Sequence, residues 1–248
     1  LLSSLLKKDV VYNFRENDIF NGGQGAPLAS IFHNLLIQQR QIEKPACILN
    51  IGGIANITLV VSKNNEELKS FDVGPGNCLL DEWVRKHTKM KYDKNGEASN
   101  IGKTSEIILN QAIDNFDNIN NQKKLSFDIK DFDLNFVKGL SYEDGLSTLV
   151  DFTAIIIHQS ILESIKIKEN ERLIIIVCGG GRKNLSLMES IKKRLQKNIS
   201  LKIIDDYKVD GDYIESQAFA YLAIRSLLNK EISYPNTTNV QKPSTGGV

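Results

Sequence analysis

Two glycine turns with an acidic residue beside them constrain the fold more than any other feature. The first, Leu-Asn-Ile-Gly-Gly-Ile-Ala-Asn (residues 49–56), lies between two apolar runs, which predicts a tight hairpin between strands. The second, Asp-Val-Gly-Pro-Gly-Asn (residues 72–77), begins at the end of the next apolar run. Bare backbone N–H groups in such turns can face an anion. The arrangement therefore places an acid, Asp72, where phosphate chemistry can take place.

The order of apolar and polar runs along the chain predicts an α/β fold. Strands are expected at 10–14, 46–51, 56–62, 67–72, 173–177 and 202–204, and helices at the N-terminus and at 28–39, 77–86, 103–116, 147–165, 185–196 and 213–228. The three strands between 46 and 72 are joined by short turns, which favours an antiparallel meander. The run at 173–177 is apolar throughout, which is typical of a strand covered on both faces.

The composition excludes several classes of partner. The 31 basic and 30 acidic residues are interspersed, which argues against nucleic acid as the main partner. No apolar stretch approaches the length needed to cross a bilayer, so we expect a soluble, cytoplasmic protein without a membrane partner. The cysteines are odd in number and far apart, which indicates buried, reduced thiols. The histidines show no metal-ligand spacing, and no metal-binding residue is predicted.

A triple glycine, Gly179, Gly180 and Gly181, follows the buried strand at 173–177 and precedes a helix. Without side chains these residues let the backbone lie against a nucleotide, while the helix N-terminus faces phosphate or ribose. Strand-glycine-helix turns also occur for packing alone, so the motif leaves both interpretations open. Asn184 is correspondingly either a helix N-cap or a contact to a base.

Asp72 is the sharpest candidate for catalysis. A carboxylate at a strand end, followed by a rigid Gly-Pro-Gly turn, is placed to take a proton from a nucleophile beside a phosphate site. The alternative is an acid that caps the following helix through an Asx-turn, which is the commoner use of such residues.

A second group of polar residues surrounds the glycine-rich loop 22–25. Arg15 could hold a carboxylate bidentately, and Gln24 could bond an amide or a sugar hydroxyl. The alternative for Arg15 and Asp18 is a pair on the surface. Glu215, in the first turn of an apolar helix, is either a substrate contact or an acid that suits the helix dipole.

Taken together, these motifs resemble the anhydro-N-acetylmuramic acid kinases, members of the superfamily of actin, hexokinase and acetate kinase folds. The resemblance is carried, in chain order, by Phe-Arg (14–15), Asp-Ile-Phe-Asn-Gly-Gly-Gln-Gly-Ala-Pro-Leu (18–28), Asn-Ile-Gly-Gly-Ile-Ala-Asn (50–56), Asp-Val-Gly-Pro-Gly-Asn (72–77), Cys-Gly-Gly-Gly-Arg-Lys-Asn (178–184), Ile-Glu-Ser-Gln-Ala-Phe-Ala-Tyr-Leu-Ala (214–223), Pro-Asn-Thr-Thr (235–238) and Pro-Ser-Thr-Gly-Gly (243–247).

The resemblance implies a two-lobed ribonuclease H-like, actin-like ATPase fold with mixed sheets flanked by helices. Its division would be a remainder of the first lobe at 1–145 and a second lobe at 146–248. It also implies a kinase that uses ATP and Mg²⁺, opens 1,6-anhydro-N-acetylmuramic acid with water and phosphorylates O6, in cell-wall recycling, as a homodimer. Asp72 would be the base. Nucleotide would contact Gly52, Gly53, Asn56, Gly179, Gly180, Gly181 and Asn184, and sugar would contact Arg15, Asp18, Gly23, Gln24, Asn77 and Glu215.

The chain departs from the family pattern at three places, one of which is Asn13, where relatives usually have Asp before Phe-Arg. Family members carry a Gly/Ser/Thr-rich phosphate loop near their N-terminus, and the chain contains no equivalent, so we expect an N-terminally incomplete copy with an incomplete first lobe. Leu125 and Ile129 stand where relatives commonly have Lys and Arg. A non-catalytic sugar or nucleotide sensor is the alternative. A carbamoyl-transfer relative would be expected to carry a His-x-x-x-His pair, which the sequence lacks.

Overall fold

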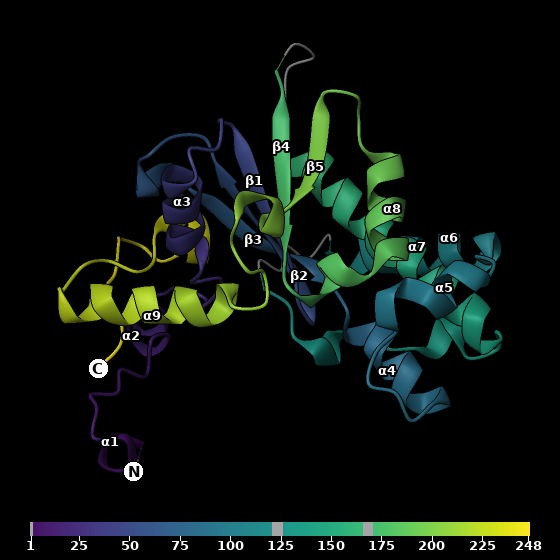
Figure 1. Cartoon of the computed structure of the whole chain (residues 1–248), viewed down its shortest axis with the longest axis horizontal. Coiled ribbons are helices and arrows are strands. Elements are labelled where there is room, and N and C mark those ends of the chain that lie inside the picture. Colours follow the sequence, from purple (N-terminus) through teal and green to yellow (C-terminus); the bar gives the residue numbers. More distant parts are fainter. Residues whose placement is uncertain (1, 121–125, 166–170) are drawn as a thin grey trace.

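A five-stranded mixed sheet forms the centre of the computed structural model, which describes residues 2–120, 126–165 and 171–248 (Figure 1). The strands are β1 (Ala46–Ile51), β2 (Ile54–Val60), β3 (Lys69–Pro75), β4 (Leu173–Cys178) and β5 (Ile199–Ile203), in the order β3-β2-β1-β4-β5. Strands β1, β2 and β3 form the predicted antiparallel meander. Strands β4 and β5 extend the sheet in parallel with β1.

Helices cover both faces of this sheet (Figure 1). One face packs against α4 (Cys78–His87), α5 (Glu97–Ile101), α6 (Glu106–Asn120), α7 (Tyr142–Ser164) and α8 (Leu185–Arg194); the other packs against α3 (Ser30–Gln39) and α9 (Ile214–Leu227). The remaining helices are α1 (Leu2–Leu6), α2 (Glu16–Phe20) and α10 (Pro235–Thr238), and short 3₁₀ turns lie at Asn65–Glu67, Lys94–Gly96, Ile129–Asp131, Asn135–Val137, Gly180–Lys183 and Ile204–Tyr207.

The alternation of side chains along β1 explains the two cores. Cys47, Leu49 and Ile51 belong to the core on the α7 side. Ala46 and Ile48 belong to the core on the side of α3 and α9. Successive strand residues point to opposite faces, so Asn50 falls on the face of α3 and α9. That face carries the polar residues described below.

Two expected elements differ from the structure. Residues 10–14 do not form a strand: Tyr12 is exposed and exchanges two backbone hydrogen bonds with Val248, and Asn13 has a φ of 56°, which ends the extended run. The long helix begins at Tyr142 rather than at 147. The side chain of Ser141 caps this helix by accepting the N–H of Asp144. The first turn of the helix is polar, so the spacing of apolar residues does not indicate where the helix begins.

The expected boundary between residues 145 and 146 falls inside α7. The sheet takes β1 to β3 from one side of this boundary and β4 and β5 from the other. The described residues on both sides therefore share one sheet.

Among the described residues, one helix, α7, is long and apolar enough to cross a membrane by length and composition, whereas no such stretch was expected from the sequence. In the structure most of this helix is buried, and α7 packs against the sheet and against α4, α6 and α8. Its apolar character is that of a core helix.

Candidate functional site

The glycine turns that follow β1 and β4 lie side by side, because β1 and β4 are parallel neighbours and end at the same edge of the sheet. The first turn, Gly52–Gly53, connects β1 to β2, and the second begins at Gly179 after β4. A Cβ added at Gly179 would lie 2.5 Å from Asn50 Oδ1 and 2.7 Å from the carbonyl oxygen of Ile51. Gly179 also has a φ of 78°, which only glycine adopts without strain. The close approach of the two turns therefore depends on this residue.

The start of α4 joins the two turns. The carbonyls of Gly52 and Gly53 accept the N–H groups of Asn77 (2.8 Å) and Gly76 (2.9 Å), and the side-chain amide of Asn77 donates to Ile51 (3.1 Å). In a trans peptide the N–H points opposite to the C=O. The N–H of Gly53 therefore points away from α4, as a turn that faces an anion requires.

A cavity of about 250 Å³, here named the Asp72 cavity, lies on the α3 and α9 face of the sheet. It brings together four of the residues singled out in the sequence: Arg15, Asn56, Asp72 and Glu215. Its further lining residues are Ala26, Pro27, Leu28, Ala29, His33, Asn50, Ile54, Ser126, Phe127, Ile214, Ala218, Phe219 and Leu222. Two carboxylates, Asp72 and Glu215, thus face a space that also contains one cation and two amides.

The Asp72 carboxylate is half-buried and held by a segment distant in sequence. Its Oδ2 accepts the N–H of Phe127 at 3.0 Å and the hydroxyl of Ser126 at 3.1 Å. Burial raises the pKa of Asp72, and these two hydrogen bonds and the charge of Arg15 offset only part of that increase. Asp72 does not cap α4, whose N-cap is Asn77, so the Asx-turn alternative is wrong.

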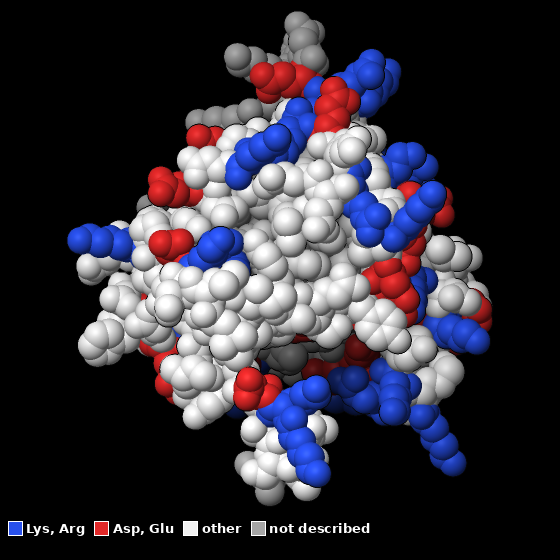
Figure 2. Space-filling view, turned by 60° about the vertical axis from the view of Figure 1, so that its left-hand side comes forward, with Lys and Arg blue, Asp and Glu red and all other residues white. Residues whose placement is uncertain are grey.

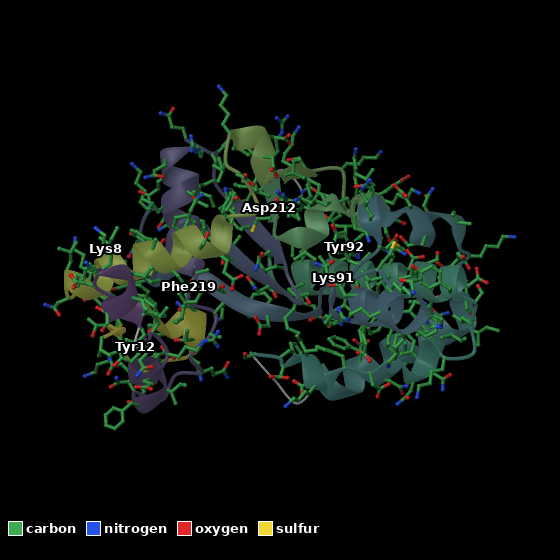
Figure 3. The ribbon with its side chains drawn as sticks, turned by 60° about the horizontal axis from the view of Figure 1, so that its bottom comes forward. Lys8, Tyr12, Lys91, Tyr92, Asp212 and Phe219 are labelled. Atoms are coloured by element: carbon green, nitrogen blue, oxygen red, sulfur yellow. The ribbon has the colours of Figure 1, made fainter. Side chains whose placement is uncertain are left out.

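A second cavity of about 430 Å³, here named the Gly180 cavity, lies beyond the turns and is lined by Gly180, Asn184 and residues of α4 and of 92–95. Figure 3 shows Phe219, a wall residue of the Asp72 cavity, and Tyr92, a wall residue of the Gly180 cavity, with the strands between them. Asn77 lines the Gly180 cavity, so the structure separates it from the sugar-side residues with which it was grouped.

Hydrogen bonds and ion pairs of Arg182 hold the turn at the Gly180 cavity in place. Arg182 is buried, and its guanidinium bonds Asp205 (2.7 and 3.1 Å), Asp212 (2.8 Å) and the carbonyl of Gly179 (3.0 Å). Asn184 accepts the N–H of Leu187 at 3.0 Å and caps α8, which confirms the N-cap interpretation. The backbone of this turn is therefore fixed by charged and polar contacts.

Asp18, Gly23 and Gln24 lie outside both cavities. Asp18 is fully buried and accepts the N–H of Gly25 (2.7 Å) and the hydroxyl of Thr238 (2.6 Å), so it is not part of a surface pair with Arg15. A Cβ at Gly23 would overlap the Asp18 carboxylate. The exposed Gln24 donates its backbone N–H to Thr238. These residues hold the loop that leads to the cavity wall.

The structure adds polar residues that the sequence did not single out, among them Asn50, Ser126 and His33. His33 is buried, and its Nδ1 lies 2.8 Å from the hydroxyl of Thr58. Alternation along β1 could have placed Asn50 on this face. His33 and Ser126 carry no local signal, since their contacts depend on how α3 and residues 126–127 pack on the sheet.

His33 is expected to make folding sensitive to acid. Burial lowers its pKa from 6.5 to about 4. Between these values the unfolded chain binds a proton that the folded chain does not, so the stability of wild type falls by about 3 kcal/mol as the pH drops to 4. His33→Gln should therefore gain that amount relative to wild type between pH 7.5 and pH 4, measured by urea unfolding. A difference that stays constant with pH, or matches that of the surface control His87→Gln, would contradict this assignment.

Within the described ranges, no group of three or more His, Cys, Asp or Glu side chains could hold a metal ion. All three cysteines are free and buried, as expected, and burial raises the pKa of Cys78 to about 11 and of Cys178 to about 12. Leu125 lies outside the described residues, whereas the exposed Ile129 would lie 3.4 Å from a Cβ placed at Gly53. An apolar side chain thus borders the first turn.

The model of the family described as anhydro-N-acetylmuramic acid kinase matches residues 1–248. The anhydro-N-acetylmuramic acid kinase of Pelagibacter ubique is 86% identical over 248 residues, which are 100% of this chain and 66% of the relative. That of Zymomonas mobilis is 37% identical over 99% of this chain and 65% of its own length.

Among solved structures, the activator of the 2-hydroxyisocaproyl-CoA dehydratase from Clostridium difficile, with bound ADPNP, is similar with a TM-score of 0.44 and 12% identity, over 79% of this chain and 69% of its own. The chain spans slightly less than two thirds of the length of the curated relatives named above. The family match covers every motif of the two cavities. The chain therefore belongs to the anhydro-N-acetylmuramic acid kinase family.

Proposed function

We propose that this chain is the larger part of an ATP-dependent kinase that opens 1,6-anhydro-N-acetylmuramic acid with water and phosphorylates O6, giving N-acetylmuramic acid 6-phosphate. One observation carries the proposal: the glycine turns separate a cavity that contains Asp72 from a second cavity that Gly180 and Asn184 line at the start of the second turn and of α8. A phosphoryl group held at the turns would have the acceptor sugar on one side and the nucleoside on the other.

The nucleotide side of the proposal rests on backbone access. The surface at Gly180 is open, and the neighbouring Asn77 and Asn184 offer amides, which suits the adenosine end of ATP. The turn at Gly52 and Gly53 would face the phosphates, and Asn56 would border them from β2. The braced backbone would hold the phosphoryl group in place, and positioning supplies most of the catalysis in phosphoryl transfer.

Asp72 would act on the sugar side. Its ionised carboxylate would take a proton from a water molecule that attacks the anomeric carbon, the bond from that carbon to O6 would break, and O6 would take the γ-phosphoryl group with release of ADP. Arg15 would bind the carboxylate of the sugar's lactyl group, and Glu215 would accept a hydrogen bond from a hydroxyl. Asp18, Gly23 and Gln24 would support these contacts through the loop they hold.

The reaction would also use Mg²⁺, which would neutralise the charge of the transferred phosphoryl group. It keeps several waters and usually binds through substrate phosphates and one or two carboxylates, so it requires no dedicated cluster of ligands. Oxygen atoms of Asn50 and Glu215, which both line the Asp72 cavity, fit that limited role.

We further propose that the complete enzyme is a two-lobed, ribonuclease H-like, actin-like ATPase of the cytoplasm that pairs as a homodimer. Because the sheet joins residues 1–145 to residues 146–248, both ranges would belong mainly to one lobe. The other lobe would carry the first phosphate loop of the family.

The test uses a composite protein in which this chain replaces the matching part of the Pelagibacter ubique relative, to which it is 86% identical. With the anhydro sugar, ATP and Mg²⁺, we expect a 6-phosphorylated sugar and ADP, identified by ³¹P NMR and mass spectrometry. The unmodified relative is the control. No product from the composite, with an active control, would contradict the proposal. Binding of the sugar without turnover would support the non-catalytic alternative.

A further inference from the structure

The segment that contains Ser126 and Phe127 contacts the reacting carboxylate, although the proposed reaction assigns it no part. We propose that the Ser126 hydroxyl and the Phe127 N–H are positioning groups that hold Oδ2 of Asp72, so that Oδ1 is the oxygen that accepts the proton from water. This inference rests on the proposed function, in which Asp72 is the base.

The geometry separates the two oxygens of this carboxylate. Both hydrogen bonds go to Oδ2, from Phe127 at 3.0 Å and from Ser126 at 3.1 Å. Among the described residues, Oδ1 accepts no hydrogen bond. A carboxylate with one oxygen held by two donors cannot rotate freely about its Cβ–Cγ bond, so the second oxygen stays in a defined direction in the Asp72 cavity.

Aromatic packing holds this segment against β3. The ring of Phe127 is buried and lies 5.9 Å from the ring of Phe116 and 5.5 Å from that of Phe132. Phe116 comes from α6 and also packs against β3, where a Cβ added at Gly74 would lie 3.1 Å from its Cζ. The donors to Asp72 are therefore fixed relative to the strand that carries Asp72. Loss of the hydroxyl alone should leave the Phe127 N–H in place.

The same hydrogen bonds affect the charge of Asp72. A hydrogen bond donated to the ionised form lowers a carboxyl pKa, which opposes the increase caused by burial. The other charged or titratable groups that face this cavity are Arg15 near α2, His33 on α3 and Glu215 on α9. Because Ser126→Ala changes none of them, its effect on the pKa of Asp72 comes from the lost hydroxyl. The sign is upward.

The kinetic test compares Ser126→Ala and Ser126→Thr in the composite protein. For Ser126→Ala we expect the acid limb of the profile of kcat/KM against pH to move to higher pH. The loss should be about fivefold on the acid side, roughly the value of one hydrogen bond, and should shrink toward parity as the pH rises. Ser126→Thr keeps the hydroxyl and should restore the wild-type profile. A loss by one constant factor at all pH values would overturn the inference.

A second measurement separates this inference from the proposed function. In the chain itself, ¹³C NMR of the Asp72 carboxyl, assigned by its absence in Asp72→Asn, should report a higher pKa in Ser126→Ala than in wild type. An unchanged titration overturns the inference even if the composite protein is an active kinase. If the composite protein makes no product, the proposed function fails while the NMR result still decides whether Ser126 holds this carboxylate.

Discussion

Asp72→Asn in the composite protein is expected to lower kcat by about 10³-fold, the size of effect seen when a general base is removed. Asparagine keeps the shape of the side chain and an oxygen for the N–H of Phe127, but it cannot take a proton from water. The measurement is the initial rate of ADP and sugar phosphate formation at saturating sugar and ATP. Turnover within tenfold of wild type would exclude Asp72 as the base.

The same variant should not lose stability, which distinguishes a lost base from a damaged fold. Since the folded-state pKa of Asp72 is raised, the folded chain holds the ionised form less well than the unfolded chain does. Above the ordinary pKa of an aspartate, ionised Asp72 therefore costs stability, and the neutral amide removes that cost. Asp72→Asn should unfold at the same or a higher urea concentration than wild type. Glu189→Gln, which alters an exposed pair with Lys193, is the matched control and should keep full turnover.

Gly179→Ala is expected to destabilise the chain by about 2–4 kcal/mol, the sum of a left-handed φ at a residue with Cβ and of overpacking. The new methyl group would meet the carbonyl of Ile51 and Oδ1 of Asn50. Ile51 does not move easily, because its carbonyl also accepts the Asn77 amide, and Gly179 cannot shift away, because Arg182 holds its carbonyl. Urea unfolding of the chain measures the loss.

Gly139→Ala is the control for this substitution, because a Cβ there would meet nothing within 4 Å and its φ is not positive. It should be neutral or stabilise the chain slightly, by reducing the freedom of the unfolded state. In the composite protein, Gly179→Ala should also weaken ATP binding measured by calorimetry, whereas Gly139→Ala should not. Equal effects of the two substitutions on stability would show that the turn tolerates a side chain.

The parts of the fold and site that could be predicted are those set by neighbouring residues. Local hydrophobic patterns and the positions of glycine predict the meander, the buried strand β4 and the helices α4 and α8. Alternation also explains why Asn50, Asn56 and Asp72 share a face: they lie on adjacent strands, and Asn56 pairs directly with Asp72. These residues reach the cavity because of strand geometry alone.

The remaining contacts depend on segments that meet only after folding. Asp18 was expected to contact sugar or, as the alternative, to pair with Arg15 at the surface, yet it bonds Thr238, which is 220 residues away. Ser126 reaches Asp72 across 54 residues, through the packing of Phe127 on Phe116. Asn77 follows the acid turn in sequence, but at the start of α4 it lies on the opposite side of the turns from Asp72, in the wall of the Gly180 cavity. Contacts between segments so far apart leave no pattern in the residues next to either partner.

The charge distribution agrees with the interspersed pattern of the sequence. Figure 2 shows a broad uncharged surface on the side that it presents, with basic and acidic side chains scattered around its edge and around a hollow. No single-sign field covers this side. Recognition of an anionic ligand is therefore expected to come from groups at short range, such as Arg15 and the backbone of the turns.

The parallel pairing of β1 and β4 has a consequence for how such a protein can diversify. The chain leaves this edge of the sheet after β3, at residues 74–76, and comes back to it only at the end of β4, so everything from α4 to β4 is a single excursion between two points of the edge that carries the turns. Changes of length within that excursion, for example at 88–105 between α4 and α6, would leave the spacing of the two turns intact. Ligand preference could thus be altered by reshaping one segment of chain while the backbone of the two turns is kept unchanged.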